Sequence, residues 1–148
     1  MTAFARYWLP PIIWMALIWG LSTDVGSADN TAKLFIGVLS RLFPWATPAQ
    51  IDLAHSLLRK LGHLTEYALL AALWFRALYL GRRLDSAPSA WTALAISVAW
   101  AMADELHQAF VPSRTASPLD VILDATGATL ATLAAHVLTT TKRILPRP

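Results

Sequence analysis

Apolar residues fall into four long runs separated by shorter polar segments. The runs occupy residues 3–22, 61–81, 90–111 and 119–138. A helix needs about 20 mostly apolar residues to cross the hydrocarbon core of a bilayer. No stretch alternates apolar and polar residues for long enough to form a β-barrel strand. The pattern predicts an all-α polytopic membrane protein, with four transmembrane helices in a single domain over residues 1–148.

Composition narrows the class of protein further. Hydrophobic residues make up 56% of the 148 residues and charged residues 14%, against about 25% charged in an average soluble domain. A soluble fold of this size has too little interior to bury so much apolar surface, and the chain is too apolar to be disordered. The absence of cysteine excludes disulfides and thiolate chemistry. Because the basic residues are scattered beside apolar runs, we expect no nucleic-acid partner.

The first run also has features of a signal peptide. It carries a basic residue, Arg6, and small residues at positions 26–28 follow it. Its apolar part is, however, long and rich in tryptophan, and begins near Pro10 and Pro11. Retention as a membrane span is therefore the favoured interpretation.

Basic residues beside the runs predict how the chain is oriented. Arg82 and Arg83 lie between the second and third runs, and Lys142 and Arg143 follow the fourth. Lysine and arginine concentrate in the cytoplasmic loops of membrane proteins. We therefore predict that both termini are cytoplasmic.

The segment between the first two runs, residues 23–60, has helical periodicity. The apolar positions of residues 34–43 fall on one arc of a helical wheel. This pattern fits equally a helix lying in the membrane interface and a helix packed across the mouth of the bundle. Residues 47–50, Thr-Pro-Ala-Gln, form a capping box with proline at the first helical position. A short helix is predicted to start there and to bend at Gly62 into the second run.

Ionisable side chains within the runs gather at one end of the predicted bundle, although charge is costly in hydrocarbon. His63, Glu66 and Tyr67 share a helical stripe near the outer end of the second run. The third run ends, and the fourth begins, at this same face. The residues expected to meet in one outward-facing polar pocket are Lys60, His63, Glu66, Tyr67, Asp104, Glu105, Gln108, Arg114, Asp120 and Asp124.

Two interpretations of this pocket stay open. Histidine and carboxylate residues three apart are used in helical-bundle metal sites, and oxygen and nitrogen ligands suit hard or borderline ions. The metal-ligand candidates are His63, Glu66, Asp104, His107 and Asp124. The favoured interpretation needs no cofactor: a network of carboxylates, histidines and Arg114 holds the helices together or binds a polar head group. The planar guanidinium of Arg114 suits a bidentate bond to Asp104 or Asp120.

Some of these residues have a plainer explanation. Asp120 follows Ser117 and Pro118, a good helix start, so a capping role is as well supported as a place in the pocket. Gly127 and Ala128 form a small-residue face, which is typical of close helix packing.

Two stretches resemble the signatures of the VanZ-like family. The first is K-L-G-H-L-T-E-Y-A-L-L over residues 60–70. The second is D-E-x-x-Q-x-F-x-P-x-R followed by D-x-x-x-D-x-x-G, over residues 104–127. The sequence departs from the family pattern at Ser113, where a glycine often precedes the arginine, and at Asp124, where asparagine is common. The second departure adds a negative charge to the pocket.

The resemblance implies a small multi-pass protein of the bacterial cytoplasmic (inner) membrane, in a family named for a membrane protein linked to teicoplanin resistance. The implied partners are membrane lipids and a lipid-linked cell-wall precursor or a glycopeptide. One function class is a non-enzymatic protein whose pocket binds a lipid or drug head group. The other is an intramembrane hydrolase or transferase acting on a phospho-lipid, metal-assisted or not, with Glu66, Asp104 or Asp124 as acid or base. The sequence contains no nucleophile motif or phosphate-binding loop, so we assign no catalytic residue.

Overall fold

The chain is helical throughout the part that the computed structural model describes, which is residues 2–23, 28–114 and 116–144, without the side chains of residues 3, 28–34, 143 and 144. This confirms the all-α prediction. The elements in chain order are α1 (Ala3–Tyr7), α2 (Leu9–Leu21), α3 (Ala28–Leu42), α4 (Pro48–Arg76), the π-helical turn η2 (Ala77–Gly81), α5 (Ser86–Gln108) and α6 (Pro118–Ile144).

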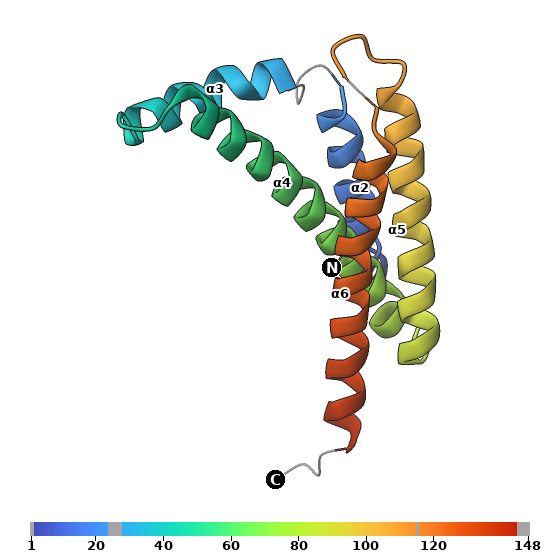
Figure 1. The fold of residues 1–148 in the computed structure, drawn as a ribbon. Coiled ribbons are helices and arrows are strands. Elements are labelled where there is room, and N and C mark those ends of the chain that lie inside the picture. The colour runs from blue at the N-terminus through green and yellow to red at the C-terminus, as the bar shows by residue number, and fades with distance from the viewer. Residues whose placement is uncertain (1, 24–27, 115, 145–148) are drawn as a thin grey trace.

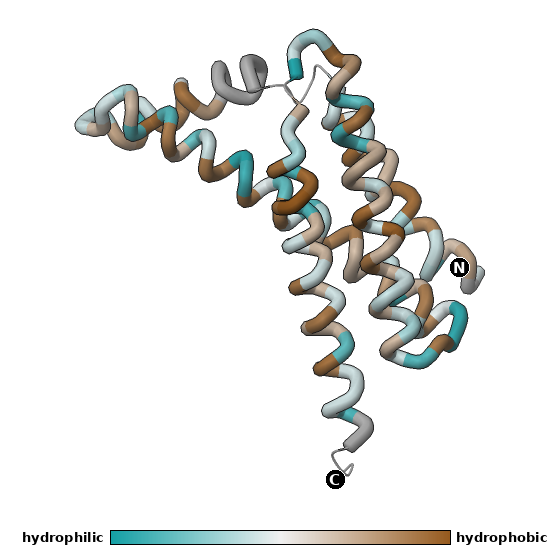
Figure 2. The backbone as a smooth tube through the Cα atoms, turned by 45° about the vertical axis from the view of Figure 1, so that its right-hand side comes forward, coloured by the Kyte–Doolittle hydropathy of each residue, from teal (hydrophilic) through white to brown (hydrophobic). Residues whose placement is uncertain are grey.

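Helices α5 and α6 run side by side, α4 crosses them at an angle, and α2 packs against α4 and α5 (Figure 1). The second half of α4 belongs to this bundle, whereas its first half and α3 project from it as an arm. We call the end of the bundle where α2 and α5 finish and α6 begins the cavity end. The opposite end, where η2 leads into α5, is the basic end. Figure 2 shows hydrophilic positions along the first half of α4 and in the turn between η2 and α5.

Within the described residues, one helix is long and apolar enough to cross a membrane, Pro118–Lys142 in α6, and Leu9–Leu21 is a shorter apolar helix. The coarse expectation of an apolar helical protein therefore holds, but the count of four spans does not follow from the helices alone. In α4 the charged residues Arg59, Lys60 and Glu66 interrupt the apolar sequence, and in α5 serine, threonine and tryptophan residues lower the mean hydropathy.

The first apolar run is two helices rather than one. The helix is interrupted at Trp8, although the N–H of Trp8 still donates to the carbonyl of Phe4 at 2.9 Å. Prolines occupy the first turn of α2, and because proline has no N–H and clashes with the preceding turn, it cannot continue a helix that began earlier.

The second run and the predicted short helix before it form one continuous helix, α4. The capping box is confirmed: the backbone N–H of Gln50 donates to Thr47 Oγ1 at 3.4 Å, and the N–H of Thr47 donates to Gln50 Oε1 at 2.9 Å. The bend expected at Gly62 does not interrupt the helix, which runs unbroken from Pro48 to Arg76. A single glycine costs a helix only about 1 kcal/mol relative to alanine, which is too little to end one of this length.

The backbones of α4 and α6 touch where they cross. A Cβ atom added to Gly127 would lie 2.2 Å from the carbonyl oxygen of Leu64. Glycine is required at this point, as the small-residue face in the sequence predicted. The fully buried side chains of Tyr67 and Leu70 pack next to the crossing, together with Ile18 of α2 and Ala101 of α5.

The basic end has its own apolar core. Phe75, Leu78 and Ala93 are buried there, and Trp8 packs edge-on against Trp74 with ring centroids 6.1 Å apart. This packing fixes the position of α4 relative to α5. It therefore also determines which polar residues of the two helices lie at the same level at the cavity end.

Candidate functional site

A cavity of about 270 Å³ opens at the cavity end, between α2, α4, α5 and the connection that follows α5. Its polar lining consists of Ser22, His55, Arg59, His63, Glu66, Asp104, Gln108 and Arg114. Ile18, Leu21, Phe35, Leu58 and Gly62 complete the wall. The cavity is therefore amphiphilic, with charged groups of both signs beside aliphatic and aromatic surface.

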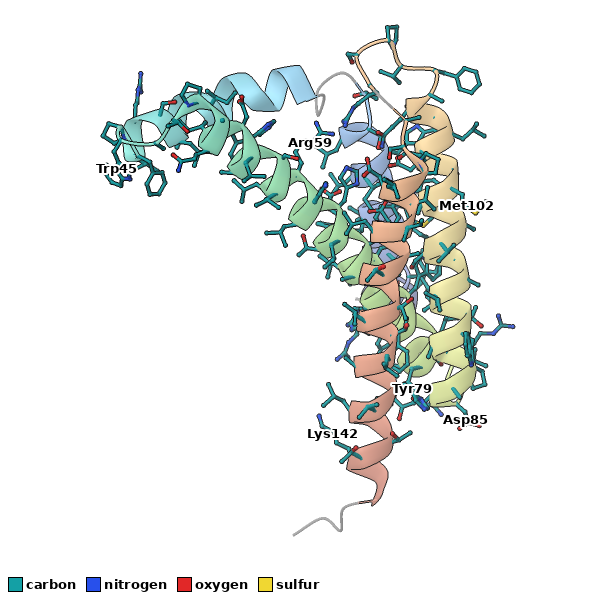
Figure 3. All side chains as sticks on the ribbon, in the orientation of Figure 1. Trp45, Arg59, Tyr79, Asp85, Met102 and Lys142 are labelled. Carbon is teal, nitrogen blue, oxygen red and sulfur yellow. The ribbon has the colours of Figure 1, made fainter. Side chains whose placement is uncertain are left out.

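One face of α4 supplies half of the polar lining. His55, Arg59, His63 and Glu66 follow one another at intervals of four, four and three residues, and residues at this spacing share a helix face. Each residue adds about 1.5 Å of rise, so Arg59 lies roughly 10 Å nearer the start of α4 than Glu66 does. In Figure 3 Arg59 extends from α4 toward the end of α2.

Asp104 of α5 is the polar centre of the opposite wall. It is 2% exposed, and it accepts hydrogen bonds from Ser22 Oγ and, at 3.0 Å, from Gln108 Nε2. The Ser22 hydroxyl has a single hydrogen, so at any moment it donates either to Asp104 or to the carbonyl of Ile18, which lies 3.1 Å from Ser22 Oγ. These bonds join α2 to α5.

His63 and Asp124 form the deepest ionisable pair, with Nδ1 and Oδ1 3.4 Å apart. Asp124 is 1% exposed and Tyr67 is fully buried beside it. Among the described residues, Tyr67 Oη has no hydrogen-bond partner, and Asp124 Oδ1 has the ion pair with His63 but no hydrogen bond. This pair couples the cavity wall on α4 to α6.

Arg114 closes the rim and does not make the bidentate carboxylate bond expected from the sequence. Its guanidinium donates to backbone carbonyls at the C-terminal end of α2, those of Leu21 and, at 3.2 and 3.3 Å, Thr23. Carbonyls left without a partner at a helix end are good acceptors, and they lie closer to Arg114 than the carboxylates do. Partial burial lowers the pKa of Arg114, and the positive charge of Arg59 lowers it further, so the two cations share one electrostatic environment.

Not every residue expected in the pocket lines it. Glu105 is outside the lining, and its carboxylate accepts a hydrogen bond from the backbone N–H of Ser117. Asp120 is in the first turn of α6, outside the lining. Lys60 is exposed. Tyr67 and Asp124 are buried outside the lining. His107, a metal-ligand candidate only, stacks on Trp19 with ring centroids 4.4 Å apart.

Ser22, His55 and Arg59 were missed by the sequence analysis. His55 and Arg59 lie one and two turns before His63 on the same stripe, so extending the helical spacing backward through Gly62 would have found them. Ser22 had a weaker signal, as the polar residue that ends the first apolar run.

The described part of the chain contains no group of three or more His, Asp or Glu side chains arranged to hold a metal ion. Of the five metal-ligand candidates, His63 and Asp124 form a close pair, Glu66 and Asp104 line the cavity, and His107 faces away.

The family model described as VanZ/LLP1 matches residues 7–139, which is nearly the whole chain. The chain belongs to the VanZ/LLP1 family. The match contains every residue of the cavity lining, so the site is part of the family's domain. Comparisons with curated proteins and with solved structures give no significant match.

Within this VanZ/LLP1 domain, Phe35 is the lining residue contributed by the described side chains of α3. Phe35 lines the wall and its ring lies 6.1 Å from that of His55. Val38 and Leu42 on the same helix stay 47% and 62% exposed. The helix therefore reaches the cavity mouth and also leaves an apolar surface uncovered, which keeps both interpretations of its amphipathic pattern open.

Proposed function

We propose that this VanZ/LLP1 protein binds the anionic head group of a membrane-embedded lipid or a lipid-like drug in its cavity, at the outer face of the bacterial inner membrane, and thereby changes teicoplanin susceptibility. The observation that carries the proposal is the pair Arg59 and Arg114 in a cavity that also has an apolar wall. Guanidinium groups hold phosphate and carboxylate with directed hydrogen bonds. A ligand with an anionic group and an apolar chain matches both parts of the lining.

The proposal includes four membrane spans, with the cavity end outside. Its support is the charge at the other end of the bundle. Arg76 donates to the carbonyl of Arg6 at 3.0 Å, and both guanidinium groups lie over the ring of Tyr7. Arg82 and Arg83 follow η2. Basic residues next to apolar helices favour the cytoplasmic side.

Single cysteines test this orientation, since the natural chain has none. Trp45→Cys lies at the tip of the arm, Ser113→Cys after α5, and Ala87→Cys at the basic end, all at exposed positions. An impermeant thiol reagent added to intact cells should label the first two and leave Ala87→Cys unmodified until the membrane is opened. Labelling of Ala87→Cys from outside would reverse the orientation and remove the proposed place of action.

Teicoplanin susceptibility tests the function. Expression in a susceptible bacterium should raise the inhibitory concentration of teicoplanin, and Arg59→Gln should abolish this increase at unchanged membrane abundance. The matched control is Lys60→Gln, which removes a positive charge from the neighbouring exposed position and should behave like the wild type. Equal protection by wild type and Arg59→Gln would refute the role of the cavity.

The pair of His63 and Asp124 supports a second candidate, an intramembrane enzyme acting on a phospho-lipid. An aspartate 3.4 Å from a histidine is an arrangement that orients a general base, and Glu66 lies on the same face of α4. Under this candidate, His63→Gln would abolish the phenotype and leave lipid binding intact. Under the binding function, the phenotype follows lipid affinity.

A further inference from the structure

The charges lining the cavity are separated by sign along its depth. His55 and Arg59 lie nearer the start of α4, and Glu66 lies two turns further along the same face. On α5, which runs the other way, Asp104 lies one turn deeper than Gln108. Arg114 is at the rim, after α5. Apart from His63, which is paired with Asp124, the rim is cationic and the base is anionic.

The rim holds donors whose hydrogen-bonding capacity is not used. His55 is 9% exposed and lines the cavity, yet its Nε2 has no hydrogen-bond partner among the side chains and backbone that the structure describes. The same holds for Arg59 Nη1 within those residues. Buried polar groups are nearly always paired, so these two atoms indicate an acceptor-bearing ligand at the rim.

At the base, Glu66 is the carboxylate left for a ligand. Asp104 is occupied by Ser22 and Gln108, and Asp124 faces His63. The carboxylate of Glu66 makes no hydrogen bond to a described residue. The charge that acts on it most strongly is that of His63, followed by those of Asp124, Asp104 and Arg114. Because His63 faces Asp124, Glu66 is left to accept hydrogen bonds from a cationic donor in the cavity.

We infer that the cavity takes a zwitterionic phospholipid head group with a primary amine, the phosphate on Arg59 and Arg114 and the ammonium on Glu66. This inference rests on the proposed function and names its ligand class. Leu21, Phe35 and Leu58 line the cavity while remaining 47%, 40% and 43% exposed, and they offer the lipid's acyl chains a continuous apolar path.

The lining distinguishes a primary amine from a quaternary one. A trimethylammonium group has no N–H to donate and is held by aromatic cages. Phe35 is the one aromatic side chain in the described lining, which is too few for a cage. Glu66 instead provides an acceptor for an N–H donor. Phosphatidylethanolamine therefore fits the cavity better than phosphatidylcholine, and phosphatidylglycerol leaves Glu66 without a partner.

The test measures binding of short-chain lipids to the full-length protein, purified and delipidated in detergent. The probes are dihexanoyl phosphatidylethanolamine, phosphatidylcholine and phosphatidylglycerol, with O-phosphoethanolamine as the soluble head group. Wild-type protein should bind the phosphatidylethanolamine roughly tenfold more tightly than either other lipid, because a hydrogen bond between charged groups contributes about that much. It should bind soluble O-phosphoethanolamine more weakly still.

Variants separate this inference from the proposed function. Glu66→Gln should remove the preference for phosphatidylethanolamine while leaving phosphatidylglycerol binding unchanged. Arg59→Gln should weaken the binding of all three lipids, and Lys60→Gln should leave the binding of all three unchanged. Thermal unfolding without lipid checks that each variant is folded, and the wild-type preference is measured independently of any variant.

Three outcomes would overturn the inference. Equal affinity for phosphatidylethanolamine and phosphatidylglycerol, unaffected by Glu66→Gln, refutes the ammonium site and leaves the anionic head-group function standing. If soluble O-phosphoethanolamine binds as tightly as dihexanoyl phosphatidylethanolamine, the acyl chains contribute nothing and the inference that the ligand is a lipid is refuted. Binding of every lipid unchanged by Arg59→Gln refutes the inference and the proposed function together.

Discussion

The two ends of the bundle are built from the same helices but treat polar groups differently. At the basic end, polar side chains are used: Ser86 Oγ lies 2.9 Å from His136 Nδ1 and 2.6 Å from Thr139 Oγ1, and Arg76 bonds to the carbonyl of Arg6. At the cavity end Asp104 and Arg114 are hydrogen-bonded too, but other described side-chain atoms of ionisable residues are buried without a hydrogen bond. They belong to His55, Arg59, His63, Tyr67, His107 and Asp124.

This difference indicates which end of the bundle serves stability and which end serves function. Burying a polar group without a partner costs about 1–3 kcal/mol, so a fold selected for stability alone would pair such groups or replace them. Neutral groups are also left unpaired nearer the basic end, on Trp74 and Ser89, but charge is concentrated at the cavity. The cavity end is therefore where we place ligand binding, and the basic end serves packing and orientation.

The largest predicted loss of stability follows removal of the acid that links α4 and α6. Asp124→Ala leaves His63 facing an empty buried site, and breaking one partner of a buried pair costs about 3–5 kcal/mol. The free energy of unfolding in detergent measures it. Asp124→Asn keeps the shape and a hydrogen-bond acceptor and should lose less. Equal stability of Asp124→Ala and wild type would show that the pair does not hold the helices together.

The next largest effect lies at the crossing of α4 and α6, between the two ends. Gly127→Ala places a methyl group against the carbonyl of Leu64, and overpacking of this kind costs about 1–3 kcal/mol. Gly37→Ala in α3 is the matched control, since nothing lies within 4 Å of its added Cβ. It should be neutral or stabilising by up to about 1 kcal/mol. If both variants lower the melting temperature equally, close packing does not explain Gly127.

The sequence predicted the cavity end more completely than the path of the chain toward it. Helical spacing and apolar context brought out His63, Glu66, Asp104 and Gln108, because charge within an apolar run has few structural uses. The same reasoning expected a bend at Gly62. The helix instead continues through Gly62, so His55 and Arg59 lie on the same face as His63.

Tertiary contacts decided what local pattern could not. Arg114 donates to carbonyls at the C-terminal end of α2, which lie about 90 residues earlier in the chain, so no local sequence motif predicts them. The bond between Ser22, at the end of α2, and Asp104 of α5 likewise joins segments that are far apart in the sequence. The stacking of His107 on Trp19 depends on how α2 and α5 are rotated against each other, which hydrophobic periodicity does not fix.

The smallest effect is expected at the basic end. Ser86→Ala removes the hydroxyl group shared by His136 and Thr139, and the loss of such hydrogen bonds costs about 1 kcal/mol. Unfolding in detergent should show this small decrease, while teicoplanin susceptibility of cells stays that of the wild type at equal abundance. A lost phenotype with Ser86→Ala would mean that function is not confined to the cavity end.

The central claim, that Arg114 and its neighbours act on a head group rather than only hold the fold, is tested most directly by Arg114→Lys. Lysine keeps the charge and loses the planar fork that positions an anion. Arg76→Lys is the control at the basic end. The measurement is teicoplanin susceptibility beside membrane abundance for both variants. We predict that Arg114→Lys loses protection at wild-type abundance while Arg76→Lys retains it. Protection by Arg114→Lys equal to that of the wild type, or a loss that merely follows reduced abundance, would contradict the account.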